Sequence, residues 1–150
     1  MTFVEDDPLI GDVNDAAKKI HQKLKEVESS TKPTAIVWGG ETTVKIKGSG
    51  LGGRNQELAL IVAELAHQDP IRKSWTFLSG GTDGRDGPTE AAGAIVDQET
   101  CKRILNEGYQ VYDFLAENNS NKALQISNDL LHTGATGTNV ADVQILLVSQ

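Results

Sequence analysis

The chain lacks most of the features that mark secreted, membrane or nucleic-acid-binding proteins. Cys101 is its one cysteine, so an internal disulfide is excluded and a reducing compartment is favoured. No apolar run approaches the ~20 residues that a membrane-spanning helix needs, and the first residues lack the basic and apolar segments of a signal peptide. The 14 lysines and arginines are outnumbered by 21 aspartates and glutamates, and this net charge of −7 argues against nucleic acid as a partner. We therefore expect a cytoplasmic protein, with a mitochondrial location left open.

Apolar residues and glycines are well represented. A length of 150 residues with 38% hydrophobic and 23% charged residues is typical of one packed domain and argues against disorder. The 15 glycines fall mostly in short clusters rather than in a repeat. Such clusters indicate tight loops that carry function.

Helical and extended patterns alternate along the sequence. Residues 1–12 are acidic and turn-like and are interpreted as a lead-in. Apolar residues recur every three or four positions over 14–27, which predicts an amphipathic helix, so we expect 1–33 to belong to the same domain as the rest. Strands are predicted at 34–38, 43–47, 75–79 and 144–148, and helices at 55–67, 100–106, 112–117 and 122–127; residues 92–96 fit either a strand or a helix end. This alternation predicts an α/β fold, a mixed sheet flanked by helices in a single domain.

A glycine-rich stretch precedes the helix predicted at 55–67. Gly48, Gly50 and Gly53 match the spacing of a dinucleotide-binding fingerprint, in which a pyrophosphate rests on the helix N-terminus. The match is weak evidence, because glycine-rich sequences produce such spacings easily. Asp83 also lies too far along the chain to be the expected acidic residue of that motif. The fingerprint alone does not establish a nicotinamide or flavin site.

Arg54 opens the same helix and is the strongest candidate for chemistry. An arginine at a helix start can hold a carboxylate or phosphate bidentately and neutralise charge in a transition state. The alternative is that Arg54 pairs with an internal acid, while Glu57 merely favours the helix dipole. The residue types alone support both interpretations equally.

Other polar loops offer further candidates. In the loop of residues 80–89, Asp83 or Asp86 is a possible Mg²⁺ ligand near a phosphoryl donor, but capping of turns and of the following helix is favoured for an aspartate beside glycine. Glu41 follows two glycines at a strand end and either binds a hydroxyl or lies in a turn. The loop of residues 133–139 supplies hydroxyls and amides suited to an oxygen-rich ligand, although loops rich in serine, threonine and glycine are common without any function.

Several of these loops together resemble one family. The matching motifs are Gly39-Gly-Glu-Thr-Thr-Val44, Gly50-Leu-Gly-Gly-Arg-Asn-Gln-Glu57, Gly81-Thr-Asp-Gly-Arg-Asp-Gly-Pro-Thr89, Ala91-Ala-Gly-Ala94 and Thr136-Gly-Thr-Asn139. In this order they resemble the MOFRL domain, the C-terminal domain of the D-glycerate 2-kinases. The resemblance assigns 34–150 to that domain.

The resemblance implies an activity, cofactors and partners. Enzymes of this kind transfer the γ-phosphoryl group of ATP to the 2-hydroxyl of D-glycerate with Mg²⁺, in a cleft between two α/β domains. The large N-terminal domain is absent from this sequence, so the resemblance implies a partner domain elsewhere and no catalysis by this chain alone. Two alternatives are a nucleotide-binding domain of a hydroxypyruvate-reducing oxidoreductase and a non-catalytic interaction module. The oligomeric state is left open.

The resemblance also ranks the candidate residues. Arg54 matches the motif arginine and is predicted to be catalytic, by stabilising the transferring phosphoryl group or the substrate carboxylate. Substrate or nucleotide binding is predicted for Glu41, Gly52, Gly53, Asn55, Thr82, Asp83, Asp86, Thr136, Thr138 and Asn139. One departure is Asn119, where the family commonly has aspartate; asparagine substitutes readily if the position serves a turn.

Overall fold

A mixed seven-stranded sheet forms the centre of the protein. The structure is a computed structural model that describes residues 1–149. In chain order the elements are β1 (Thr2–Val4), β2 (Leu9–Asp12), α1 (Val13–Val27), β3 (Thr34–Thr43), α2 (Arg54–Gln68), β4 (Trp75–Gly81), β5 (Gly93–Asp97), α3 (Thr100–Asn106), α4 (Val111–Ala116), α5 (Ser120–Ser127), β6 (Leu130–Leu131) and β7 (Asp142–Val148). The strand order is β1-β3-β7-β4-β5-β6, and β2 also pairs with β3. The predicted fold class, a mixed sheet with helices, is confirmed.

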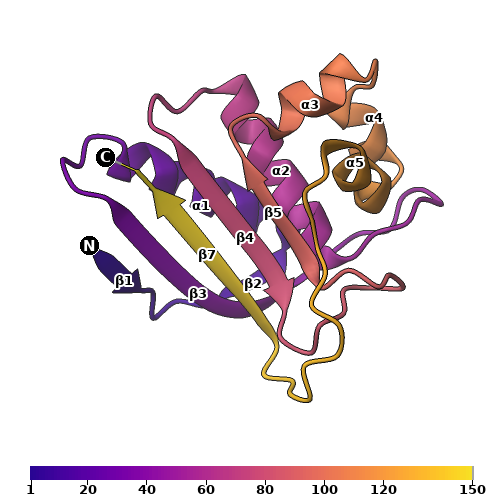
Figure 1. The fold of residues 1–150 in the computed structure, drawn as a ribbon. Coiled ribbons are helices and arrows are strands. Elements are labelled where there is room, and N and C mark those ends of the chain that lie inside the picture. Colours follow the sequence, from indigo (N-terminus) through magenta and orange to yellow (C-terminus); the bar gives the residue numbers. More distant parts are fainter. Residues whose placement is uncertain (150) are drawn as a thin grey trace.

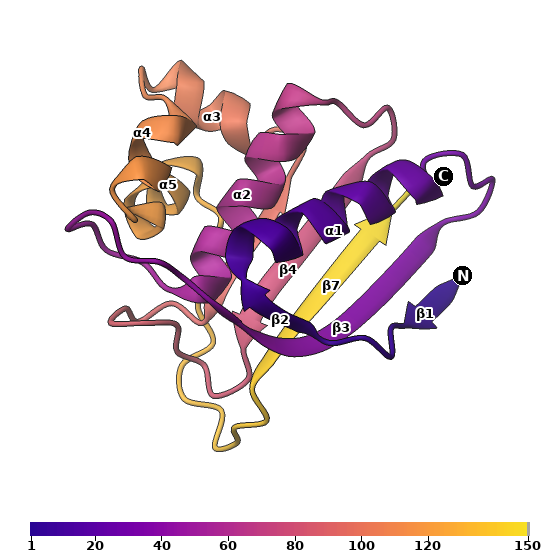
Figure 2. The same cartoon turned by 180° about the vertical axis from the view of Figure 1, so that it is seen from behind.

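The helices pack on one face of the sheet. Figure 1 looks onto the sheet with α1 and α2 behind it, and Figure 2 shows the same two helices in front from the opposite side. Helix α1 begins where Asp12 caps it by accepting from the backbone amide of Asn14 (2.8 Å), and it buries Ile20 and Leu24. Helix α2 lies between α1, the sheet and the α4–α5 pair, which explains why it is apolar on nearly every side.

Two predicted strands were placed wrongly. The strand expected at 34–38 continues through Gly39 and Gly40 to Thr43, because both glycines pair with β7 and β2 passes very close to Gly40. A Cβ on Gly40 would lie 2.1 Å from the Leu9 carbonyl oxygen, so only glycine fits there. Residues 44–47, expected to form a strand, lie in a loop instead.

The lead-in interpretation of 1–12 was also wrong. This segment contributes β1 and β2, which both run parallel to β3. The undecided segment at 92–96 is strand β5, paired antiparallel with β4. The remaining predicted helices are confirmed with shifts of a residue or two at their ends.

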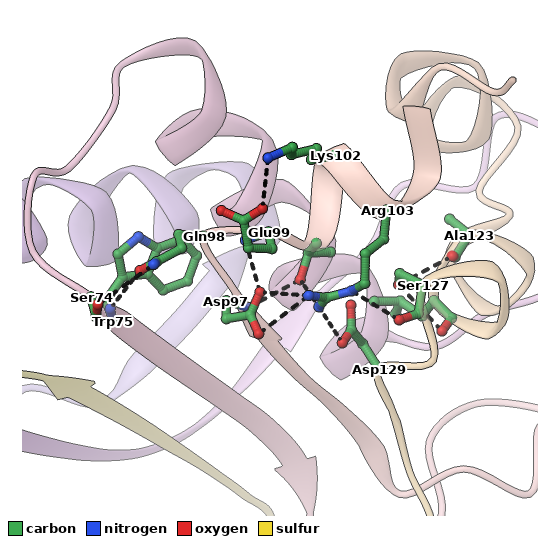
Figure 3. A network of polar contacts seen from close by, with 12 residues as sticks. Ser74, Trp75, Asp97, Gln98, Glu99, Lys102, Arg103, Ala123, Ser127 and Asp129 are labelled. Atoms are coloured by element: carbon green, nitrogen blue, oxygen red, sulfur yellow. Dashed lines mark hydrogen bonds and ion pairs between the residues drawn. The ribbon is translucent and has the colours of Figure 1, made fainter. Parts of the chain in front are cut away.

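A polar network ties the small helices to the end of the sheet remote from the loops described below. Arg103 of α3 donates from Nη2 to Asp129 Oδ1 (2.7 Å) and from Nε to the Ser127 carbonyl (3.1 Å), and its Nη1 pairs with Asp97 Oδ1 (3.1 Å), as Figure 3 shows. Burial raises the pKa of the Asp129 carboxyl. One guanidinium therefore joins α3, the end of β5 and the turn after α5.

Candidate functional site

Three loops and one helix end meet where β3 and β4 end and β7 begins, and we call this end of the sheet the loop edge. The loops are residues 44–53, 82–92 and 132–141, and the helix end is the start of α2 (Figure 1). Strands β3 and β4 end at this edge and β7 begins there, with Gly40 and Gly81 flanking Asp142. The topology therefore gathers most of the sequence motifs in one place.

Arg54 occupies the centre of the loop edge. Its Nε lies 2.6 Å from Asp142 Oδ2 and its Nη2 lies 3.0 Å from Asp142 Oδ1, which is a bidentate contact with a side chain only 1% exposed. Its Nη1 lies 3.2 Å from Glu41 Oε1, whose side chain is 61% exposed. The hydrogen bond to Asp142 and the nearby carboxylates raise the pKa of Arg54, so the guanidinium stays charged.

The carboxylates of Asp142 and Glu41 differ in how firmly they hold Arg54. Asp142 belongs to the central strand and is buried, so it fixes the position of the guanidinium. Glu41 is exposed, so solvent screens its pairing with Arg54 and the pairing is weak. An anion approaching from solvent would meet the Nη1 side of Arg54 and compete only with Glu41. The structure therefore confirms that Arg54 pairs with an internal acid, and it leaves one side of the guanidinium accessible.

The carboxylate of Asp86, which belongs to the loop of residues 82–92, lies against the N-terminus of α2. Its Oδ1 accepts from the backbone amide of Asn55 (3.1 Å) and its Oδ2 from that of Gln56 (2.9 Å), while the side-chain amides of both residues donate to the same carboxylate. Burial nevertheless raises the pKa of Asp86, against the opposing effect of these hydrogen bonds. Asp86 is therefore a helix cap, although it caps the earlier helix α2 and not the following helix that the sequence had suggested.

This cap removes the dinucleotide interpretation of the glycine-rich stretch. The helix amides that would bind a pyrophosphate are already bound to Asp86. A Cβ on Gly53 would lie 2.3 Å from Asp86 Cγ, and one on Gly52 would lie 2.2 Å from Ser120 Oγ. These glycines allow protein groups, rather than a ligand, to approach the backbone.

Buried polar side chains extend inward from the cap. Ser79 of β4 donates to Asn55 Oδ1 (2.7 Å), and Gln56 donates to Thr89 Oγ1 (3.0 Å) and accepts from Asn121 Nδ2 (2.8 Å). Asn55 and Asp86 are 1% and 3% exposed. The expectation that these two residues face a ligand is therefore corrected: they hold the loops together.

The loop of residues 44–53 is fastened to the turn before α5. Asn118 Oδ1 accepts from the amides of Lys47 (2.6 Å) and Gly48 (3.1 Å), and its Nδ2 donates to both carboxylate oxygens of Glu57 (3.2 Å each). Burial raises the pKa of the Glu57 carboxyl, and the hydrogen bond from Asn118 opposes this. Glu57 thus anchors a loop, in addition to lying in the first turn of α2.

The loops of residues 82–92 and 132–141 pack against each other. Thr82 donates from its hydroxyl to the Ala141 carbonyl (2.7 Å) and accepts from the Val140 amide (2.8 Å), and Thr136 donates to the Thr82 carbonyl. The Asp83 carbonyl accepts from the Thr136 amide (3.4 Å). Thr82 and Thr136 therefore use their hydroxyls within the protein.

A pocket of about 450 Å³ adjoins Arg54 at the loop edge. Its lining includes the glycine-rich loop, the end of β3 and the start of α2: Thr42, Thr43, Val44, Ile46, Gly50, Gly52, Gly53, Glu57, Gly87, Pro88 and Asn118. The pocket has the size of a small-molecule site.

Comparison with known proteins supports the resemblance seen in the sequence. The model of the MOFRL family matches residues 34–142. The chain belongs to the MOFRL family. Glycerate kinase of Homo sapiens is 46% identical over 134 residues, covering 87% of this chain and 26% of that protein. D-glycerate 2-kinase of Thermotoga maritima is 45% identical over 142 residues, covering 91% of this chain and 33% of that protein.

Solved structures give the same result. A crystal structure of glycerate kinase from Thermotoga maritima superposes with a TM-score of 0.91 at 43% identity, covering 98% of this chain and 36% of that one. A crystal structure from Pyrococcus horikoshii superposes with a TM-score of 0.88 at 38% identity, covering 99% and 34%. The MOFRL chain therefore spans about a third or less of the length of these relatives.

The MOFRL motifs divide into inward and outward residues. Asn55 and Asp86 are buried, Thr82 is half-buried, and Gly52 and Gly53 pack against other loops. At the solvent side of the loop edge lie Arg54, Glu41, Asp83, Thr136, Thr138 and Asn139. Asn119 belongs to the inward group, because its Oδ1 accepts from the Leu51 amide (3.2 Å) in the turn before α5. An asparagine there serves the turn without a carboxylate.

Of the two aspartates considered as Mg²⁺ ligands, Asp86 is occupied by the start of α2, and Asp83 stays a prediction. No group of three or more His, Cys, Asp or Glu side chains within residues 1–149 is arranged to hold a metal ion. Both Asp86 oxygens are bound by the start of α2, and Asp83 Oδ1 accepts from the Arg85 amide (3.0 Å). Asp86 is therefore not available as a metal ligand.

Asp142 is the site residue that the sequence did not reveal. It opens the last strand, and its side chain faces α2 rather than solvent. An acidic residue at the start of an apolar strand was the available signal, but its partner Arg54 lies 88 positions away.

Over the same residues 1–149, no helix is long and apolar enough to cross a membrane.

Proposed function

We propose that this chain is the C-terminal domain of a glycerate kinase. In this proposal the complete enzyme transfers the γ-phosphoryl group of ATP to the 2-hydroxyl of D-glycerate, in a cleft between the loop edge and a second α/β domain. The chain by itself is inactive, because it supplies only one wall of the cleft.

The observation that carries the proposal is the arrangement of Arg54. Asp142 holds two of its nitrogens, and the third faces the exposed Glu41. Phosphoryl transfer depends mainly on positioning and on neutralising charge over the equatorial oxygens, and one arginine can contribute a factor of about 10³ or more in rate. Because a buried acid already fixes the guanidinium, little reorganisation is needed for it to stabilise the transition state. Membership of a family whose relatives are named glycerate kinases supports the same role.

The exposed residues of the loop edge complete this wall of the cleft. Thr138 and Asn139 lie in an exposed loop near Asp83 and are proposed to bind oxygen atoms of glycerate or the triphosphate. Glu41 is proposed to leave Arg54 when an anionic ligand arrives. ATP supplies the phosphoryl group, and Mg²⁺ arrives with the triphosphate rather than on a site built by this chain.

A chimaera tests the proposal. This chain replaces the matching portion of Thermotoga maritima D-glycerate 2-kinase, and ADP formation is followed with D-glycerate and ATP. We expect the chimaera to form ADP only with glycerate present, and the isolated chain to form none. Oxidation of NADH by hydroxypyruvate in the chimaera, without glycerate-dependent ADP formation, would favour the oxidoreductase alternative.

The role of Arg54 is tested in the same chimaera. Arg54→Ala is expected to lower kcat by roughly 10³-fold with a smaller change in the KM for ATP, because the lost interaction is strongest in the transition state. Arg72→Ala, which removes an exposed arginine just before β4 at the opposite end of the sheet, is the matched control and should leave kcat within a few-fold. An unchanged kcat for Arg54→Ala would remove it from the catalytic role.

A further inference from the structure

The sheet has an apolar face that no helix covers. Figure 1 looks directly onto this face, whereas α1 and α2 lie on the other one. Along β7 the buried residues Gln144, Leu146 and Val148 alternate with Ile145 and Leu147, which point to the uncovered side. We call the uncovered side the open face.

Side chains on the open face align across the sheet. The pairing registers place Val4 beside Val37, Val37 beside Ile145, Ile145 beside Leu78, and Leu78 beside Ile95. These residues form an apolar row that crosses β1, β3, β7, β4 and β5. The next row toward the chain termini has Ala35, Leu147 and Thr76 at its centre and the polar residues Thr2 and Asp97 at its two ends, and it borders a hollow of about 480 Å³.

This pattern differs from that of a sheet with one face in water. Strands with one solvated face alternate apolar and polar residues, whereas strands buried on both faces are apolar throughout. The apolar row contains no charged side chain, and its members Val4 and Ile95, with Leu147 of the next row, are 75%, 39% and 49% exposed. Contiguous exposed apolar surface of this kind marks an interaction surface.

We propose that the open face binds the second domain of the glycerate kinase, so that this inference rests on the proposed function. The solved Thermotoga structure contains the whole fold of this chain in about a third of its length, so most of that molecule lies outside the matching domain. The open face is also continuous with the loop edge. Val143, flanked by Gly39 and Gly80, lies directly between the apolar row and Asp142. Arg54 lies on the helix-covered side of the strand ends, so a domain docked on the row forms the other wall of the cleft by reaching past Val143 and around the ends of β3 and β4, whereas a second copy of this chain would supply no such domain.

Cysteine labelling tests the occupant of the open face. Leu147→Cys places a thiol on this face, and Tyr112→Cys on exposed α4 is the matched control; native Cys101 is buried and its pKa is raised by burial, so it reacts slowly. Maleimide modification at each position is followed by mass spectrometry, in the 150-residue chain and in the Thermotoga chimaera. We expect both thiols to react rapidly in the chain alone. In the chimaera, position 147 should react about tenfold or more slowly, because a covered thiol reacts only when the interface opens, while position 112 is unchanged.

Two results would overturn the proposal. Equal labelling of position 147 in the chain and the chimaera would mean that the second domain lies elsewhere. Slow labelling in the chain alone that speeds up on dilution would mean that a second copy covers the face.

A second measurement covers the case in which the cysteine disturbs folding. Leu147→Lys should leave the Tm of the chain nearly unchanged and lower that of the chimaera, and equal lowering in both would also contradict the proposal. Kinase activity separates the two hypotheses. Protection of position 147 from labelling without glycerate-dependent ADP formation would contradict the proposed function alone. Glycerate-dependent ADP formation without protection of position 147 would contradict the docking proposal alone.

Discussion

Replacing Arg54 is expected to destabilise the fold, apart from any effect on chemistry. Arg54→Ala leaves the buried side chain of Asp142 without its partner. Removing one partner of a fully buried ion pair costs about 3–5 kcal/mol. Because the Arg54 side chain is 36% exposed, water reaches the site and screens the charge, so we expect about 3 kcal/mol.

The opposite replacement should cost less. In Asp142→Ala the guanidinium turns toward solvent and keeps Glu41, so the loss is about 1–2 kcal/mol for two charge-assisted hydrogen bonds. The double variant removes the buried charge together with its partner. It should therefore be more stable than the sum of the single losses predicts, by about 1–2 kcal/mol.

Urea unfolding of the 150-residue chain measures these losses. Trp38 and Trp75 are 5% and 3% exposed, so their fluorescence reports unfolding of the core. With a slope of about 2 kcal/mol per molar urea, a loss of 3 kcal/mol lowers the midpoint by about 1.5 M. Additive losses, or a loss for Arg54→Ala no greater than that for Asp142→Ala, would refute the reasoning that Asp142 depends on Arg54.

Three further predictions concern the loops and the helices. Gly53→Ala should destabilise the chain by about 2–3 kcal/mol, because the new methyl group collides with Asp86. The control Gly134→Ala, at an open position, should cost about 1 kcal/mol from its positive φ alone. Equal losses of stability in urea unfolding would contradict this prediction. Glu57→Gln should gain stability relative to the native chain as the pH rises through the raised pKa of Glu57, since the native chain there ionises a buried carboxyl that glutamine lacks; a gain confined to acidic pH would refute it. Arg103→Met should lower the free energy of unfolding by about 2 kcal/mol, measured by the same urea method, and an unchanged midpoint would show that the network in Figure 3 contributes nothing.

Regular periodicity made the helices predictable. The middle of the helix of residues 54–68 is apolar on nearly every side, and the expectation that it is covered on more than one side agrees with its position between α1, the sheet and α5. The strands were harder, because glycine usually interrupts a strand. Gly39 and Gly40 remain in β3 because the neighbouring strands approach their bare backbone closely.

The candidate site was predictable in its residue types and less so in its orientations. Arg54 was identified from its place after the glycines, and the structure puts it at the loop edge. Nothing local to Asp86 tells whether its carboxylate points to solvent or to a helix 30 residues earlier in the chain. Asp142 required the same long-range information, since its pairing depends on the central place of β7 in the sheet.

The contact between Asp86 and α2 bears on the cost of assembling a ligand site. It joins the loop of residues 82–92 to the glycine-rich loop before any ligand is present. The conformational entropy of ordering these loops is therefore lost when the chain folds, and little remains to be lost when a ligand binds. A loosened cap, as in Asp86→Ala, would transfer that entropy loss to binding and weaken affinity without removing any group that touches the ligand.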